Sequence, residues 1–399
     1  MKVLFLTWEF PPRITGGLGT ACWGMVRGLL ELGVEIFLVL PDSEPCGFHL
    51  KRPEDIDLPI HAMDGHGTGR KREGGPYRSD PLSNVRYREL VESVIVSLDF
   101  DIVHAHDWLT YEGGLHAKEA AGKPLVCHVH STEFDRSCGR QDERIEEYER
   151  IGLSLADRVV AVSRFTAEAV RSRYGVAPEK IRVVHNGFLL EDTPSPAARP
   201  SDEPVVLFMG RMTCQKGPDI FLEVARGVLG RFPGVRFIMA GEGDMTERLM
   251  RRVSRYGIKD RVTFTGFLER EDVARVLSTS DVLVAPSVSD PFNITVLEAM
   301  SRGLAVLVSR QSGVIEAVRH VLTEDYWNVD GMIRHVVSLL KDPEEMTHLG
   351  RLGKAEVRRI SWRDRAFELT EVYAELLDFP VIPRAGRDYI NGARNRRIK

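Results

Sequence analysis

Short apolar runs alternate with longer amphipathic stretches along most of the chain. The runs are nearly continuous in apolar residues, which is typical of parallel strands that are buried on both faces. Those expected to form strands are Val3–Trp8, Glu35–Leu40, Ile102–His106, Leu125–His130, Arg158–Ser163, Ile181–His185, Val205–Gly210, Val235–Gly241, Val262–Phe267, Val282–Ser287 and Ala305–Ser309. Strand and helix patterns in alternation predict an α/β fold with doubly wound sheets.

The alternation is interrupted at residues 191–204, where proline and charged residues replace large apolar ones. We interpret this segment as a linker between a Rossmann-like domain at 1–190 and a second one at 205–355. A last amphipathic helix is expected within 356–378, followed by a basic tail at 379–399. The polar stretch Lys51–Asp80 has no clear period and is expected to be an insertion in the first domain.

The composition fits a globular protein, with 43% hydrophobic and 28% charged residues. The formal net charge of -4 gives no basic field for a nucleic-acid partner. No apolar stretch is long enough to span a bilayer, and we expect a cytoplasmic protein. The scattered cysteines predict reduced thiols rather than disulfides or a zinc site. They are Cys22, Cys46, Cys127, Cys138 and Cys214.

In open parallel sheets, ligands bind beyond the carboxyl ends of the strands, so the residues that follow each strand are the candidates for chemistry. Gly16 and Gly17 lie between the first strand and a helix, where backbone N–H groups can approach a phosphate. The pattern is neither the dinucleotide fingerprint nor a P-loop. A plain tight turn explains these glycines equally well.

Two pairs of histidines lie on the expected strands, His104 with His106 and His128 with His130. A spacing of two on a strand places both side chains of a pair on one face. Four histidines could form a metal site, but packing and hydrogen bonding are the favoured interpretation for His104 and His128. His106 and His130 lie at the carboxyl ends, where a substrate would bind. The residues expected on the acceptor side are His106, Asp107, Glu133 and Arg136.

Two cations, Arg211 and Lys216, follow the strand expected at Val205–Gly210, and Gly217 precedes the next helix. They could stabilise a leaving diphosphate without a metal ion. The acidic pair Asp99 and Asp101 resembles the acid pair of metal-dependent transferases. It precedes a strand, at the wrong edge for a ligand, so we expect no metal cofactor.

Asp290 precedes a helix expected to start near Asn293, and a second carboxylate, Glu298, lies about one turn further along that helix. At the amino end of a helix they could hold sugar and ribose hydroxyls, because a buried carboxylate needs such hydrogen-bond donors. The alternative is an ordinary helix start, with Asp290 as a local turn residue.

Several motifs in the same order resemble those of one enzyme family. The segment Lys2–Gly33, with its W-E-F-P-P and G-G-L-G sequences, resembles the start of bacterial and archaeal glycogen or starch synthases. Further similar segments are His104–Trp108, Gly210–Gly217, Ala240–Asp244, Val262–Leu268, Ser289–Met300 and Ser309–Glu316. The chain is thus similar to the family-four retaining glycosyltransferases. The resemblance implies the GT-B fold, in which two Rossmann-like domains face a cleft and the last helix crosses back to the first domain.

The resemblance also implies roles for single residues. His130 would lie near the anomeric carbon, Arg211 and Lys216 would bind the diphosphate, Asp290 the donor sugar and Glu298 the ribose. The other donor-binding residues that it implies are Gly16, Gly17, Phe267, Asn293, Ile294 and Thr295. It implies no metal or other cofactor.

Two residues depart from the family pattern. Asp290 is one methylene shorter than the usual glutamate, and Asn293 replaces the usual glycine. We expect a hexosyltransferase that moves glucose from a nucleotide diphosphate to a glycan, with the base and the acceptor left open. The alternatives are a non-catalytic protein that binds nucleotide sugar or glycan, and a nucleotide-sugar epimerase. Nothing in the sequence fixes the oligomeric state.

Overall fold

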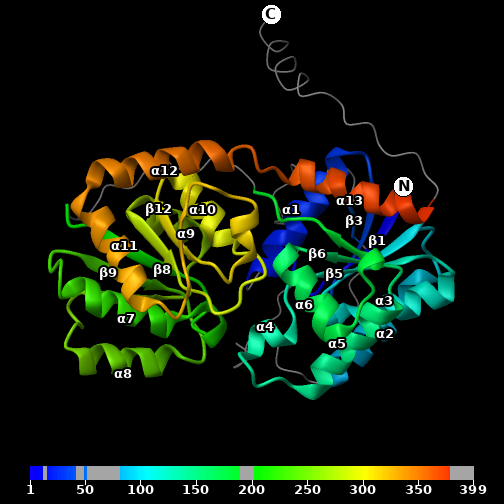
Figure 1. Cartoon of the computed structure of the whole chain (residues 1–399). Helices are drawn as coiled ribbons and strands as arrows, with labels where there is room; N and C mark the ends of the chain where they lie inside the picture. Colours follow the sequence, from blue (N-terminus) through cyan, green and yellow to red (C-terminus); the bar gives the residue numbers. More distant parts are fainter. Residues whose placement is uncertain (12–15, 42–48, 52–80, 189–201, 378–399) are drawn as a thin grey trace, which may run out of the picture.

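The computed structural model describes residues 1–11, 16–41, 49–51, 81–188 and 202–377. Two sheets with flanking helices form two domains that lie side by side (Figure 1). This arrangement confirms the predicted doubly wound α/β fold. The insertion expected at 51–80, most of the linker expected at 191–204 and the tail at 379–399 lie outside the described residues, and the domain boundaries stay a prediction.

The first domain is built on a seven-stranded sheet in the order β3-β2-β1-β4-β5-β6-β7. All neighbouring strands are parallel except β3, which is antiparallel to β2. The strands are β1 (Lys2–Leu6), β2 (Glu35–Val39), β3 (His49–Lys51), β4 (Ile102–His106), β5 (Leu125–Val129), β6 (Arg158–Ala161) and β7 (Ile181–Val183). The helices are α1 (Gly17–Glu31), α2 (Pro81–Ile95), α3 (Trp108–Ala121), α4 (Glu133–Ser137), α5 (Glu143–Leu155), α6 (Arg164–Tyr174) and the 3₁₀ turn η2 (Pro178–Lys180).

The second domain is built on a six-stranded parallel sheet in the order β10-β9-β8-β11-β12-β13. Its strands are β8 (Val205–Met209), β9 (Arg236–Ala240), β10 (Val262–Gly266), β11 (Val282–Ala285), β12 (Ala305–Ser309) and β13 (Leu322–Glu324). Its helices are α7 (Pro218–Leu229), α8 (Thr246–Tyr256), α9 (Arg270–Ser278), α10 (Ile294–Arg302), α11 (Val329–Lys341) and α12 (Pro343–Val357), with the 3₁₀ turns η3 (Cys214–Lys216) and η4 (Gly313–Glu316).

The central strands show why these sequences form parallel sheets. Every residue of β4, β5 and β12 is buried, and helices cover both faces of the sheets. Side chains on both faces therefore lose their contact with water, which favours runs of valine, leucine and isoleucine. The polar exceptions are three histidines and Ser309. His104 is in the middle of β4, while His106, His128 and Ser309 lie at or next to the carboxyl ends of their strands.

The last helix, α13 (Trp362–Leu377), crosses from the second domain to the first and packs against α1 (Figure 1). The contact depends on two glycines of α1. A Cβ atom on Gly24 would lie 2.1 Å from the Trp362 ring, and one on Gly28 would lie 2.6 Å from the Trp362 carbonyl oxygen. Only glycine permits this approach, so α1 is shaped to receive the crossing helix that was predicted.

The prediction that all cysteines are reduced thiols is wrong for one pair. Cys138, at the end of α4, forms a disulfide with Cys214 in η3. The two residues are 76 positions apart, and the pairing depends on a contact between α4 and η3 that only the folded chain makes. Cys22 and Cys127 are free, as expected, and both are buried, while Cys46 lies outside the described residues.

Within the described part of the chain, no helix is long and apolar enough to cross a membrane. The cytoplasmic location stays a prediction.

Candidate active site

Four histidine rings stack where β4 and β5 end. The parallel register sets His106 beside His128, and the spacing of two puts His104 and His130 on the same face. The ring centroids of His106 and His128 lie 5.0 Å apart, and those of His128 and His130 lie 4.4 Å apart. His104, His106 and His128 are fully buried, and His130 is partly buried.

Hydrogen bonds link the rings in two pairs. His104 Nε2 lies 3.2 Å from His128 Nδ1, and His106 Nδ1 lies 2.9 Å from His130 Nε2. The hydroxyl of Tyr373, on α13, lies 2.7 Å from His104 Nδ1. His104 and His128 are thus packed and hydrogen-bonded, in line with the favoured interpretation of these two residues.

Burial lowers the pKa of all four histidines, because a charged imidazolium loses its hydration inside the protein. The pKa falls to about 3 for His104 and His130, and well below its usual value for His106 and His128. Neighbouring rings oppose charge on His104, His106 and His128 as well. The histidine stack is therefore uncharged at neutral pH.

Asp107 fixes the backbone around His130. It follows β4 with a positive φ of 58°, a strained conformation for a residue other than glycine. Its Oδ1 accepts hydrogen bonds from the N–H groups of His130 at 2.7 Å and Ser131 at 3.3 Å. Burial raises the pKa of Asp107 to about 7. The structure thus gives Asp107 a positioning role, and its predicted contact with an acceptor stays a prediction.

The other two residues expected on the acceptor side, Glu133 and Arg136, belong to a buried ionic network. The Arg136 guanidinium donates to Glu149 Oε1 at 2.6 Å and to the Ser131 carbonyl at 2.7 Å. It also lies 3.4 Å from the Glu133 carboxylate. These contacts brace α4 against α5, and an acceptor contact by either residue stays a prediction.

In the second domain, Lys216 and Asp290 are brought together from positions 74 residues apart. Lys216 Nζ donates to Asp290 Oδ2 at 2.8 Å, and the Ser287 hydroxyl donates to the same oxygen at 3.0 Å. Asp290 is buried, while Lys216 keeps 19% of its side-chain surface exposed. Arg211 follows β8 and donates to Gln215 at 3.1 Å. Both predicted cations therefore lie at the carboxyl edge of this sheet.

The remaining donor-side residues lie on the two helix starts and one loop. Asn293 is the N-cap of α10, with Ile294 and Thr295 in its first turn and Glu298 partly buried further along. Asn293 has an ordinary φ of -83°, so asparagine is not strained where the family has glycine. Gly16 is the N-cap of α1 and Gly17 its first residue. Phe267, after β10, is 54% exposed.

The loops that carry Lys216 and Asp290 contact the segment that directly follows His130. The Ser289 hydroxyl donates to Asp135 Oδ1 at 2.5 Å, and Asp135 itself closes the capping box of α4. The disulfide between Cys138 and Cys214 joins the same two segments. The fold thereby sets the charged loops of the second domain opposite the end of the histidine stack.

The acidic pair considered for a metal lies at the opposite edge of the first sheet. Asp101 accepts a hydrogen bond from the backbone N–H of Lys2, and Asp99 forms an ion pair with the Lys2 side chain. Both aspartates have partners at the amino ends of β1 and β4, away from His130.

Comparison with known families assigns both halves of the chain. Residues 15–192 match the family described as Glycosyltransferase Family 4, and residues 177–356 match the one described as Glycosyl transferases group 1. The chain belongs to the family-four glycosyltransferases. The predicted family is thereby confirmed.

Three curated relatives span much of this glycosyltransferase. An uncharacterised glycosyltransferase of Methanocaldococcus jannaschii is 29% identical over 94% of this chain and 98% of its own. A D-inositol 3-phosphate glycosyltransferase of Segniliparus rotundus is 31% identical over 69% of this chain and 66% of its own. A glycogen synthase of Mycobacterium tuberculosis is 24% identical over 94% of both chains.

Among solved structures, a sucrose-phosphate synthase from Thermosynechococcus elongatus has a TM-score of 0.76 and 20% identity. The similarity covers 94% of this glycosyltransferase and 99% of that chain. It confirms the GT-B fold.

The sequence reasoning missed several residues of the glycosyltransferase site. Ser287 and Ser289 were not considered, because the prediction for this segment rested on its acidic residues. Only their closeness to Asp290 in the sequence could have indicated them. Tyr373 lies 269 positions from His104 in the sequence, and several strands and helices lie between Cys22 and the histidines that it approaches. No local pattern marks such contacts.

Proposed function

We propose that this glycosyltransferase moves glucose from a nucleotide diphosphate to a glycan, with retention of the anomeric configuration and without a metal cofactor. The observation that carries the proposal is the contact between the second-domain loops bearing Lys216 and Asp290 and the segment after His130. It brings cations for a diphosphate close to a neutral histidine for the sugar.

The pair of Lys216 and Asp290 suits a donor that carries both charge and hydroxyls. The ammonium group of Lys216 has three N–H donors, and Asp290 occupies one of them. Another can bind a phosphate oxygen while the pair remains intact. Arg211 adds a second cation on the same edge, so negative charge on the departing diphosphate is stabilised by groups that are already in place.

The neutral histidines suit the other half of the reaction. Positive charge develops at the anomeric carbon as the bond to phosphate breaks. A cationic residue beside that carbon would oppose it, whereas His130, with its lowered pKa, can hydrogen-bond a sugar hydroxyl without adding charge. The acceptor hydroxyl would approach on the face from which the diphosphate leaves.

The donor-side departures from the family pattern are compatible with catalysis. The shorter Asp290 still reaches Lys216, and Asn293 has unstrained backbone. This weakens the support for a non-catalytic protein that binds nucleotide sugar or glycan.

The test is release of nucleoside diphosphate from ADP-glucose, UDP-glucose and GDP-mannose in the presence of EDTA. Each donor is assayed alone, with glycogen and with D-inositol 3-phosphate, since the relatives named above differ in their acceptors. We expect release from one glucose donor that rises sharply with glycogen. Tight donor binding without turnover for every acceptor would contradict the proposal. A rise with inositol phosphate alone would contradict the choice of a glycan.

A further inference from the structure

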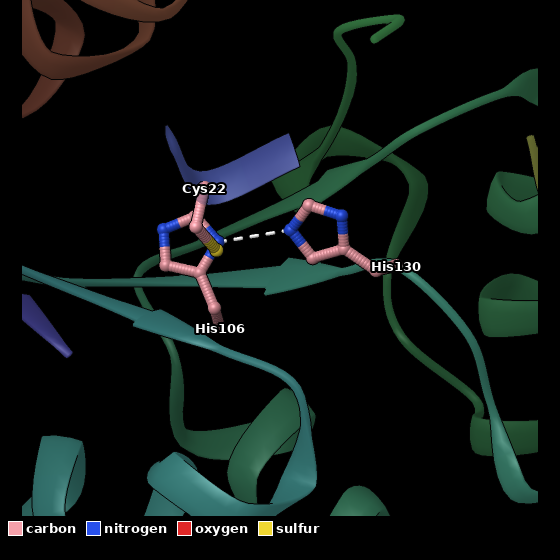
Figure 2. Close-up of side chains that lie close together, drawn as sticks. All are labelled: Cys22, His106 and His130. Atoms are coloured by element: carbon pink, nitrogen blue, oxygen red, sulfur yellow. Dashed lines mark hydrogen bonds between the residues drawn. The ribbon is translucent and has the colours of Figure 1, made fainter. Parts of the chain in front are cut away.

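A thiol lies against the outer pair of stacked histidines. Cys22 comes from α1, His106 from the end of β4 and His130 from the residue after β5 (Figure 2). One ligand atom of each residue, the Cys22 sulfur and a ring nitrogen from each histidine, lies within 4.8 Å of the other two. The carboxyl ends of β4 and β5 and the helix after β1 thus bring three metal-ligating groups to one point.

One sulfur and two imidazole nitrogens form a donor set that zinc prefers. In a tetrahedral zinc site, Zn–N distances of about 2.0–2.1 Å place two ring nitrogens about 3.3 Å apart. His106 Nδ1 and His130 Nε2 are 2.9 Å apart. If the two rings moved apart slightly, an ion could bind between these nitrogens and replace their hydrogen bond with two metal–nitrogen bonds.

The surroundings support such a site. The Thr7 hydroxyl donates a hydrogen bond to the Cys22 sulfur at 3.2 Å, the kind of outer contact that stabilises a ligating thiolate. The backbone N–H of His130 is held by Asp107 at 2.7 Å.

A second group, His104, His106 and His128, also brings three ligand atoms together. All three residues are fully buried, and none contributes sulfur. In contrast, His130 is only partly buried, so an ion can reach the group that contains Cys22. The Cys22 group is therefore the better site.

We propose that Cys22, His106 and His130 bind a thiophilic divalent cation such as Zn²⁺, which leaves one coordination position for water. Binding replaces the thiol proton with the metal, so one proton is released and the site gains one positive charge. The metal occupies His130, the residue that the proposed function sets beside the sugar. Metal binding and sugar transfer therefore exclude each other, and zinc acts as a reversible inhibitor.

The site is tested with Co²⁺ on the purified full-length protein, without reductant so that the Cys138–Cys214 disulfide stays closed. We expect a near-ultraviolet sulfur-to-cobalt charge-transfer band that Zn²⁺ abolishes. The band should be absent from Cys22→Ala and present in the control Cys127→Ala, which removes the other free thiol among the described residues. Cys22→Ser removes the sulfur while nearly keeping the size of the side chain, and circular dichroism of each variant shows whether it is folded. Together they distinguish the loss of a ligand from the loss of the fold. A wild-type protein without the band, or a band that persists in a folded Cys22→Ala, overturns the site.

A competition titration with a chromophoric zinc chelator measures affinity independently of activity. Zinc should bind Cys22→Ala at least about tenfold more weakly than wild type or Cys127→Ala, because one of three protein ligands is lost. Equal affinities overturn the site even if the enzyme proves inactive.

The second arm compares nucleotide release with and without Zn²⁺ within each variant. Zinc should inhibit wild type and Cys127→Ala, and EDTA should reverse the inhibition, while Cys22→Ala should resist it. Zinc that binds through Cys22 and leaves transfer unchanged overturns the competition. Metal binding in a protein that transfers no sugar supports the site while the proposed function fails.

Discussion

The two domains present opposite chemistry at equivalent edges. In the first domain, the strands β4 and β5 end in stacked histidines that burial keeps uncharged. In the second, the loops after β8 and β11 carry Arg211, Lys216 and Asp290, which form charged contacts. Both edges arise from the same parallel architecture. The fold therefore supplies two facing edges of different chemistry, and the proposed function assigns anion binding to the charged one and the sugar to the neutral one.

The difference also determines how each edge responds to change. A buried acid that is paired with one cation becomes costly when that cation is removed. The buried neutral histidines instead destabilise the folded protein when the pH is low enough to protonate them.

The largest effect is expected from Lys216→Ala. Turnover should fall by about 10²–10³-fold, because the proposed function assigns Lys216 to the departing diphosphate. The variant should also lose about 3 kcal/mol of unfolding free energy, since Asp290 keeps its burial and loses its cation. Steady-state kinetics and urea unfolding measure the two losses.

The double variant Lys216→Met with Asp290→Asn separates these losses. It removes both charges and should recover most of the unfolding free energy, while turnover stays low. Recovery of turnover in the double variant, or near-normal turnover in Lys216→Ala, would show that the lysine does not serve the diphosphate.

The next effect concerns the disulfide that connects the edges. Cys138→Ser with Cys214→Ser should lower the free energy of unfolding by about 2–4 kcal/mol, because the unfolded chain regains the freedom of the loop between them. Reductant should destabilise the wild-type protein by a similar amount and leave the double variant unchanged. Urea unfolding with and without reductant makes the comparison. A wild-type protein that reductant does not affect would count against the disulfide.

Acid should disturb the neutral edge. The unfolded histidines take up protons near pH 6.5, while burial holds the folded pKa of His104 at about 3. The stability gained by keeping these rings neutral is therefore fully present above pH 6.5 and decreases as the pH falls toward 3. At pH 5.5 the free energy of unfolding is lower by about 1.4 kcal/mol per buried histidine. Asp107 acts in the opposite direction between pH 3.8 and about 7, because its pKa is raised.

A variant with His104→Gln and His128→Gln isolates the contribution of the histidines, since Asp107 is present in both proteins. Its loss of stability between pH 7.5 and 5.5 should be smaller than that of wild type by about 1.4 kcal/mol per ring replaced. Urea unfolding at the two pH values gives this difference. Equal losses would mean that the rings are already charged in the folded protein.

The smallest effect is expected from Asn293→Gly, which restores the residue usual in the family. Asn293 makes no side-chain hydrogen bond to cap α10 and has ordinary backbone angles. Glycine at an N-cap costs only a few tenths of a kcal/mol, so turnover should change by about twofold at most. A gain of tenfold or more in steady-state turnover would show that asparagine restricts the donor site.

The sequence predicted those features that depend on neighbouring residues. The apolar runs gave β4 and β12 with their observed bounds, because buried parallel strands have a strong local signature. The short strands β3 and β13 escaped prediction, since neither lies within a predicted apolar run, unlike the equally short β7, which lies within the run Ile181–His185. The end of each strand pointed to His130, Arg211, Lys216 and Asp290 before any contact was known.

Contacts between distant residues were out of reach. The pairing of Cys138 with Cys214, and that of His104 with Tyr373, joins segments that only the interdomain packing brings together. Asp107 was expected at an acceptor, but its carboxylate holds the backbone of His130. The sequence shows which residues lie at the carboxyl edge of a sheet, but the partners of these residues depend on the whole fold.

The most direct test of the account is the anomeric configuration of the product, followed by proton NMR during transfer from an α-linked nucleotide glucose in EDTA. The account predicts that an α-linked product forms from the start, because the acceptor approaches on the face that the diphosphate leaves. A β-linked product, or transfer that requires an added divalent metal, would contradict it.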